Sequence, residues 1–260
     1  MSSFDINGIR IIGRCFINFL SLLGSAFIFF IQSLYHCFVP PYYFGNVARQ
    51  IIEIGFFSLP IVGLTGIFIG AVIVLQSNLS GSLIDPEQII PKLVIITIIK
   101  ELGPVLISLI MVGKVGSSIA AEIGTMRITE QIDALTTLNI NPFKYLIAPR
   151  ILASVIVFPM LTICADLIGI FGGYITAVFE FNHNSNIYIK YTAQFFNMYD
   201  FIIGLVKATA FGAIISVSSC YYGYYCREGA QGVGAATTAT VVLSSILIIL
   251  ANYMITLVHA

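Results

Sequence analysis

Five ionisable side chains stand inside long apolar runs of the sequence: Lys100, Glu101, Lys114, Asp166 and Lys207. A charge at the centre of a membrane helix costs about 2.5–3.5 kcal/mol on insertion scales. Such residues therefore usually face a protein interior or a wet cavity. Lysines at such a place can bind an anionic group, and carboxylates can pair with the lysines or relay protons. These residues are the first candidates for a functional site.

The composition places these residues in hydrocarbon. The 260 residues are 58 % hydrophobic and 9 % charged, and their mean hydropathy is +0.98. Soluble domains contain about 25 % charged residues. Twelve basic and twelve acidic residues leave no net charge and no basic patch, which excludes a nucleic-acid-binding protein. The five cysteines and three histidines have no metal-binding or redox spacing, so we expect no metal site and no catalytic residues.

The sequence predicts an all-α membrane protein with five transmembrane helices. A membrane-spanning helix needs about 20 apolar residues. Four basic residues fall in loops on one side of the predicted spans, and the positive-inside rule makes that side cytoplasmic. The N-terminus is then cytoplasmic and the C-terminus lies on the opposite side. The predicted spans are 51–76, 93–121, 151–179, 201–222 and 240–258, and the four basic residues are Arg127, Lys144, Arg150 and Arg227.

The segment from Arg10 to His36 has two interpretations. Its polar residues recur mostly every three or four positions and form one helical stripe opposite Phe and Leu. That pattern is typical of an amphipathic helix lying in the membrane interface. A sixth span is the alternative, but it would place Arg10 and Arg14 outside, against the positive-inside rule. We therefore expect an interfacial region at residues 1–48 and a transmembrane domain at residues 49–260.

The charges at depth suggest one site. Neighbouring residues on a helix point about 100° apart, so Lys100 and Glu101 must meet different partners. Our hypothesis is that both converge with Lys207 in a cavity open to the outer leaflet, where cations would suit an anionic headgroup. A Glu101–Lys207 ion pair that only orders the bundle is the equal alternative. Pro104 follows Gly103 and removes the hydrogen bond to the Lys100 carbonyl, which predicts a kink.

Three further patterns concern helix contacts. An amphipathic helix is expected at 125–138, with Ile128, Ile132, Leu135 and Leu138 on one face, as a surface connector or as a docking helix for a soluble partner. Small residues at four-residue spacing predict close helix packing within the chain or along a homodimer seam. The glycines at 229–234 predict a turn before the last span, with Thr237 and Thr238 as helix caps. The small residues are Gly66 and Gly70, Gly116, Ala120 and Gly124, and Gly169 and Gly173.

Several of these runs together resemble the MlaE-type permeases. The segment at 100–106 reads K-E-L-G-P-V-L, and that at 116–126 reads G-S-S-I-A-A-E-I-G-T-M. The segments E-Q-I-D-A-L at 130–135 and G-A-Q-G-V-G at 229–234 follow in the order of the family. The resemblance covers about 49–260, and the combination is far more specific than any single motif.

The resemblance implies the membrane subunit of an ATP-driven lipid transporter in the inner membrane of diderm bacteria. It also implies a homodimer, each copy with an interfacial N-terminal helix and five spans, bound to two copies of an ATPase subunit. A periplasmic MCE-domain protein, and in some systems a STAS-domain protein, would complete the assembly. The chain has no G-x-x-x-x-G-K-[ST] motif, so ATP and Mg²⁺ would be held by the ATPase subunit and no cofactor by this chain.

Matching positions imply residue roles. Lys100, Glu101 and Lys207 would face a lipid cavity. Better-known members carry an acid in the last span where Asn252 is the nearest residue here, a departure that changes the charge balance of the cavity. The coupling helix that fits the ATPase would comprise Glu130, Gln131, Ile132, Asp133, Ala134 and Leu135.

The function expected from the sequence is movement of phospholipid between the inner membrane and the MCE partner. A stand-alone ion- or proton-coupled carrier, with Asp166 and Glu101 as relay carboxylates, is the competing hypothesis. An intramembrane enzyme lacks a credible pair of nucleophile and base.

Overall fold

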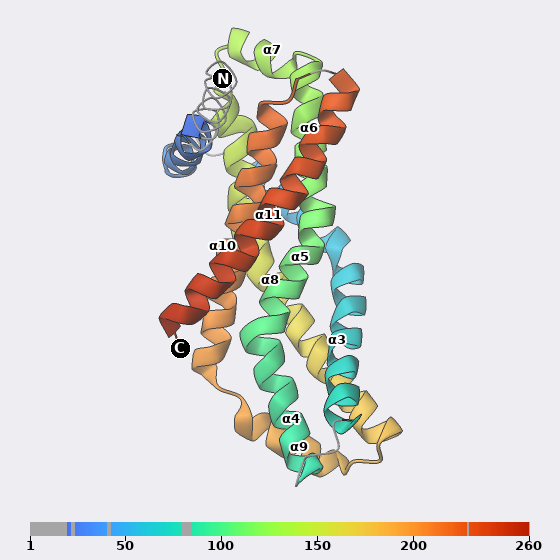
Figure 1. The fold of residues 1–260 in the computed structure, drawn as a ribbon. Coiled ribbons are helices and arrows are strands. Elements are labelled where there is room, and N and C mark those ends of the chain that lie inside the picture. The colour runs from blue at the N-terminus through green and yellow to red at the C-terminus, as the bar shows by residue number, and fades with distance from the viewer. Residues whose placement is uncertain (1–19, 22–23, 41–42, 80–84, 228, 260) are drawn as a thin grey trace, which may run out of the picture.

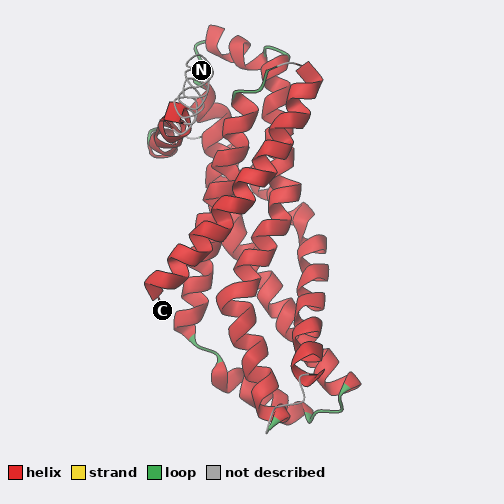
Figure 2. Ribbon diagram, in the orientation of Figure 1, coloured by secondary structure: helices red, strands yellow, loops and turns green. Residues whose placement is uncertain are grey.

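The computed structural model describes residues 20–21, 24–40, 43–79, 85–227 and 229–259, which are helical apart from short turns and contain no strand (Figure 2). Within these ranges, five helical units are long and apolar enough to cross a membrane. They confirm the predicted all-α membrane architecture, and each unit extends beyond its predicted span. The units are Phe44–Leu79, Pro86–Ile128, Phe143–Glu180, Met198–Tyr224 and Gly229–His259.

Three of the five units contain several consecutive helical elements. The first unit consists of α2 (Phe44–Ile54), the 3₁₀ turn η1 (Phe56–Ser58) and α3 (Leu59–Leu79). The second consists of α4 (Pro86–Thr97), η2 (Ile98–Leu102), α5 (Gly103–Met111), η3 (Val112–Gly116) and α6 (Ser117–Ile128). The third consists of η4 (Phe143–Ile147), α8 (Ala148–Ile175) and η5 (Thr176–Glu180); η2 to η5 are π-helical turns. The remaining helices are α7 (Gln131–Thr137), α9 (Ser185–Phe195), α10 (Met198–Tyr224) and α11 (Gly229–His259).

The helices form one elongated bundle with α7 at one end and α9 at the other (Figure 1). We call these the α7 end and the α9 end. The helix α11 crosses the bundle obliquely and finishes well short of the α9 end (Figure 1). The outward faces of α3 and α11 expose many apolar side chains. In a membrane such faces can contact lipid tails or another apolar helix, because the tails are as apolar as the side chains.

A shorter apolar helix, Gly24–Phe38, lies beside the bundle near the α7 end (Figure 1). Phe29 anchors it, being only 1 % exposed, with ring centroids 5.3 Å from Phe143 and 5.5 Å from Tyr221. Its interfacial position stays a prediction, and residues 10–19 and 22–23 of the predicted stripe lie outside the described residues. The helix α2 begins at Phe44, shortly before the expected start of the transmembrane domain.

The prediction of a single helix at 125–138 is wrong. The helix α6 continues to Ile128, and Glu130 then adopts a left-handed backbone with φ 59°, so that α7 starts afresh at Gln131. Ile132 is fully buried, whereas Leu138 is 70 % exposed and does not share its face. The restart turns α7 away from α6 at the end of the bundle (Figure 1).

The predicted turn before the last span is also wrong. The helix α11 already begins at Gly229, whose φ of 63° suits a glycine at the entry to the helix. The Thr237 and Thr238 hydroxyls donate to the Gly234 carbonyl at 2.8 and 3.1 Å, inside the helix. They therefore do not cap its N-terminus.

Glycines bring α3 and α8 into backbone contact. A Cβ atom at Gly70 would lie 1.8 Å from the Gly169 carbonyl oxygen, and one at Gly66 would lie 2.9 Å from the Ala165 carbonyl oxygen. The four-residue spacing on these two helices thus serves packing within the chain.

We predict that Gly70→Ala destabilises the bundle, because its methyl group meets backbone that cannot move aside. Overpacking costs about 1–3 kcal/mol. Gly113→Ala is the matched control, since a Cβ atom there has nothing within 4 Å. Thermal unfolding in detergent should show a lowered midpoint for Gly70→Ala alone, and equal midpoints would contradict the proposed packing.

Candidate functional site

The charges at depth are held by a π-helical turn. Lys100 and Glu101 lie in η2, immediately before Gly103 and Pro104. Pro104 has no N–H to donate to the Lys100 carbonyl four residues earlier. That carbonyl instead accepts a hydrogen bond from the Lys207 ammonium group at 3.0 Å. Pro104, which the sequence predicted to disturb the helix, thus leaves the Lys100 carbonyl free to accept from Lys207. Such π-helical turns are frequent at functional sites.

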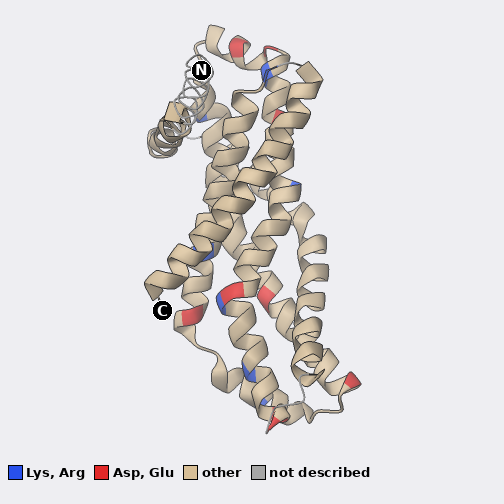
Figure 3. Ribbon diagram, viewed as in Figure 1, with Lys and Arg blue, Asp and Glu red and all other residues tan. Residues whose placement is uncertain are grey.

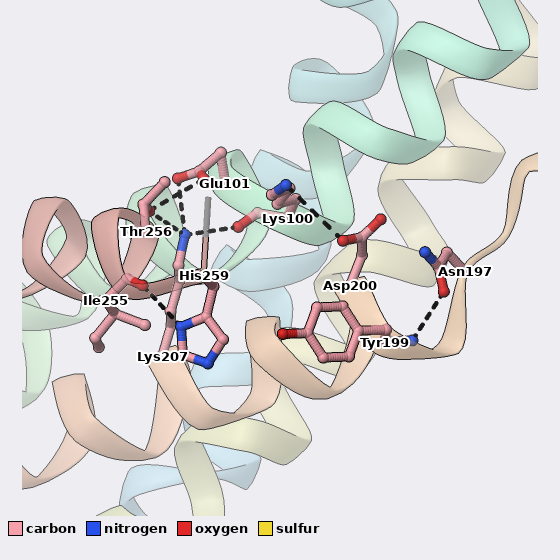
Figure 4. A network of polar contacts seen from close by, with 9 residues as sticks. All are labelled: Lys100, Glu101, Asn197, Tyr199, Asp200, Lys207, Ile255, Thr256 and His259. Carbon is pink, nitrogen blue, oxygen red and sulfur yellow. Dashed lines mark hydrogen bonds and ion pairs between the residues drawn. The ribbon is translucent and has the colours of Figure 1, made fainter.

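Lys207 on α10 is fully buried, and its three ammonium hydrogens have three acceptors. Besides the Lys100 carbonyl, Nζ lies 2.9 Å from Glu101 Oε2 and 2.8 Å from Thr256 Oγ1 (Figure 4). The Glu101–Lys207 ion pair considered from the sequence is therefore present. A buried charge is tolerated only when it is paired and hydrogen-bonded in this way.

Glu101 connects the pair to the last span. Its Oε1 accepts a hydrogen bond from the Thr256 hydroxyl, and its Oε2 accepts one from Asn252 Nδ2, both at 3.2 Å. The amide of Asn252 thus donates where an acidic residue would have brought a second negative charge beside Glu101. Lys207 and Glu101 consequently balance one another, and their network joins η2, α10 and α11.

The ammonium group of Lys100 has a different partner from that of Lys207. Its Nζ lies 3.9 Å from Asp200 Oδ1 near the start of α10 (Figure 4). The side chains of Lys100 and Glu101 are 35 % and 34 % exposed, in contrast to the fully buried Lys207. Lys100 and Glu101 thus have different partners, as predicted from the angle of about 100° between neighbouring side chains on a helix. A cavity shared by all three charges stays a prediction.

Two members of this network, Asp200 and Thr256, were not predicted. Asp200 lies near the end of a predicted span, where a charge carries no unusual signal. Thr256 was detectable only by its spacing, because a residue four positions from Asn252 lies on the same helix face. Figure 3 shows charged residues at the level of η2, between the charged ends of the bundle.

The other two ionisable residues lie apart from the network. Lys114 in η3 donates a hydrogen bond to the Phe57 carbonyl. Asp166 on α8 is 4 % exposed, and its Oδ1 has no hydrogen-bond partner among the described residues. Asp166 lines a groove of about 680 Å³ between α8 and α9. Within the described part of the chain, no group of three or more His, Cys, Asp or Glu residues is placed to hold a metal ion.

The helix α7 presents a polar surface at its end of the bundle. Ile132 is buried and Leu135 is partly buried, both packed in the main core. Arg127 Nη1 contacts Asp133 Oδ1 at 2.7 Å and so ties α7 back to α6. The remaining members of the predicted coupling segment, Glu130, Gln131 and Ala134, are exposed, as is Asp133.

Five apolar helical units with an ion pair at depth define this chain as a multi-pass membrane protein. Residues 47–258 match the family model described as Permease MlaE. The chain therefore belongs to the MlaE permease family, as its motifs predicted, and it is a membrane permease of an ABC transporter.

Relatives from three lineages support this membership. A probable ABC transporter permease protein of Rickettsia typhi is 47 % identical over 251 residues, covering 96 % of this chain and 97 % of the relative. The intermembrane phospholipid transport system permease protein MlaE of Haemophilus influenzae is 32 % identical over 252 residues, covering 96 % and 97 %. The chloroplastic protein trigalactosyldiacylglycerol 1 of Arabidopsis thaliana is 32 % identical over 210 residues, covering 81 % of this chain and 60 % of the relative.

We predict that Glu101→Gln destabilises the protein more than Lys207→Met does. The first change leaves a fully buried ammonium group without a counterion, at a cost of the order of 3 kcal/mol. The second leaves a carboxylate that is one-third exposed and keeps two hydrogen bonds.

Thermal unfolding of both single variants and of the double variant tests this asymmetry. The double variant should lose less stability than the sum of the two single changes, because the pair is coupled. Additive losses, or a larger loss in Lys207→Met, would show that the ion pair does not order the bundle.

Proposed function

We propose that this chain is the membrane subunit of an ATP-driven transporter that moves phospholipid between the inner membrane and a periplasmic MCE-domain partner. The observation that carries the proposal is the network of Glu101, Lys207 and Thr256, which holds paired charges at depth in an otherwise apolar bundle. The name of the Haemophilus relative, a phospholipid transport permease, supports the choice of substrate.

The exposed members of the network suit a phospholipid headgroup. The ammonium group of Lys100 has only a long contact of 3.9 Å to Asp200 and can approach a phosphate. Glu101, the next residue along the chain, has a carboxylate that is one-third exposed and held in place by buried Lys207. This carboxylate can accept a hydrogen bond from a headgroup amine. A cation beside a carboxylate matches a zwitterionic headgroup.

The helix α7 would receive the ATPase subunit, which would hold ATP and Mg²⁺. The chain from α4 to α6 is one helical unit, Pro86–Ile128, that joins α7 at one end to Glu101 in η2. When the paired ATPase subunits close, a push on α7 would pass through Arg127 and α6 to the charge network. Lipid-accepting and lipid-expelling shapes would then differ in their affinity for the headgroup.

The proposed orientation places the α7 end in the cytoplasm and the C-terminus on the periplasmic side. Arg127 contacts Asp133 of α7, and Arg150 contacts Glu122 of α6. Lys144 lies in η4 at the start of the third unit, and Arg227 follows the end of α10. The positive-inside rule assigns these four positions to the cytoplasmic side. A homodimer is proposed through the outward apolar face of α11, which exposes Val242, Ile246 and Ile249. A STAS-domain protein would join on the ATPase side.

A stand-alone carrier is the second candidate, because Asp166 has a buried carboxylate oxygen that finds no partner in the described part of the chain. The carrier would work without an ATPase. Reconstitution with and without the ATPase subunit distinguishes the two functions: movement of labelled phospholipid that requires ATP supports the first, and ion or proton flux through the chain alone supports the second.

We predict that Lys100→Gln lowers ATP-dependent phospholipid movement by roughly tenfold, which corresponds to the loss of one hydrogen bond to a charged group, about 1.5–3 kcal/mol. Stability should change little, because this ammonium is one-third exposed and its contact is long. Lys190→Gln on α9, an exposed lysine outside the network, is the control. Wild-type transport by Lys100→Gln would remove Lys100 from the headgroup site.

A second prediction concerns α7. Replacing two of its exposed residues, Gln131→Arg with Ala134→Arg, should abolish co-purification of the ATPase and ATP-dependent transport, since the added bulk and charge block docking. The unfolding midpoint should not change. Lys190→Glu at the opposite end should leave both readouts intact. Normal ATPase binding in the α7 double variant would contradict the docking role.

A further inference from the structure

The groove between α8 and α9 is built like a ligand site. Its volume of about 680 Å³ falls within the range of about 300–1,000 Å³ typical of small-molecule sites. Apolar side chains from η2, α8, α9 and the start of α10 form its walls. Leu167, Phe171 and Ile189 line it and are themselves 65 %, 57 % and 55 % exposed. The groove therefore opens on the lipid-facing surface, and an occupant would enter from the bilayer.

Two buried polar side chains line this apolar groove. Asp166 is 4 % exposed and Tyr188 is 2 % exposed, and both line the groove. Neither Asp166 Oδ1 nor the Tyr188 hydroxyl has a hydrogen-bond partner among the described residues. Leaving a buried polar group unsatisfied is costly, and most costly for a charged group. Such groups in a concave apolar site are the usual means by which a ligand is oriented.

Two glycines make room for these polar groups. A Cβ atom at Gly103 would lie 1.9 Å from Asp166 Oδ1, and one at Gly173 would lie 3.1 Å from the Tyr188 hydroxyl. A larger residue at either position would push the polar group out of its place. The position of Asp166 thus requires the glycine that precedes Pro104.

The charge of the groove differs from that of the Glu101–Lys207 network. The cations at the level of η2 do not line the groove and have other partners: Lys207 pairs with Glu101, and Lys100 with Asp200. Among the residues that form the groove, Asp166 is the ionisable acid and no lysine or arginine is present. A carboxyl group in these surroundings accepts a hydrogen bond from an alcohol or an amine. The groove has no cation that could balance the charge of a phosphate or a carboxylate.

We propose that this groove binds a membrane amphiphile whose polar end is a hydroxyl or an amine, with that end at Asp166 and the hydrocarbon along α8 and α9. Tyr188 lines the groove beside it. The site is separate from the one proposed for phospholipid, because the groove offers no cation to the phosphate of a headgroup. It does not depend on the transport function.

The sequence contains no tryptophan, so one introduced tryptophan reports on the groove alone. Phe196→Trp places the fluorophore in the groove wall, and Phe68→Trp, on the exposed face of α3, is the matched control. The full chain in detergent is titrated with four quenchers: dibrominated stearyl alcohol, stearylamine, stearic acid and phosphatidylcholine. We expect saturable quenching of the groove reporter by the alcohol and the amine, with apparent affinities about tenfold or more above those of the acid and the phospholipid.

Variants assign the selectivity to the carboxyl group. Asp166→Asn should keep the alcohol and lose the preference for the amine, and Asp166→Leu should lose the preference for both. Asp200→Asn, an acid at the end of α10 outside the groove, and Lys100→Gln should bind the alcohol like the parent. Phe68→Trp should be quenched without saturation and without preference among the four lipids.

Three outcomes would overturn the proposal. The first is equal quenching of Phe196→Trp by all four lipids, and the second is a preference that persists in Asp166→Leu. The third is no quenching at all, which would mean that protein covers the groove. If Asp166→Leu fails to fold, competition of unlabelled stearyl alcohol against unlabelled stearic acid on the Asp166 protein gives the same decision. Loss of phospholipid transport in Lys100→Gln with retained alcohol binding would separate this site from the proposed function.

Discussion

The ammonium group of Lys207 must satisfy three N–H donors where no water reaches it, and much of the local structure follows from this requirement. Pro104 leaves the Lys100 carbonyl free to accept one hydrogen bond. The carboxylate of the next residue, Glu101, accepts a second, and the Thr256 hydroxyl of α11 accepts the third. Two acceptors come from η2 and the third from α11, so η2, α10 and α11 satisfy Lys207 only when they are assembled together. The hydrogen bond that Pro104 removes from the helix is compensated by the contact of Lys207 with the Lys100 carbonyl.

The same requirement links the network to distant parts of the bundle. Glu101 belongs to a helical unit that runs on to α6, where Arg127 contacts Asp133 of α7. The unit is interrupted by the π-helical turns η2 and η3, and such turns within α-helices are frequent at functional sites. Elsewhere in the bundle, α3 and α8 meet backbone to backbone through glycines, which leaves no room for a larger side chain at that contact.

The sequence predicted what depends on local composition. Apolar length located the five spans, Pro104 marked the disturbed helix, and the cost of buried charge singled out Glu101 and Lys207. It missed features that depend on three-dimensional proximity: Asp200 and Thr256 have ordinary residue types in ordinary places. The break before α7 was missed because Glu130 adopts a left-handed backbone although no Gly or Pro at that position indicates a break. The early start of α11 was missed because the glycines there are part of the helix rather than of a turn.

Glu101 and Asp166 illustrate how neighbouring acids in one bundle can have different chemistry. Both lie close to Gly103, since Asp166 packs against Gly103, two residues after Glu101. Lys207 of α10 keeps Glu101 paired, and Asp166 lines an apolar groove that contains no cation. Under the two proposals, a paired carboxylate beside an accessible lysine would recognise a molecule with both charges, and a solitary carboxyl group would select a hydrogen-bond donor. The groups that surround each acid, rather than its residue type, would then decide which end of a lipid it binds.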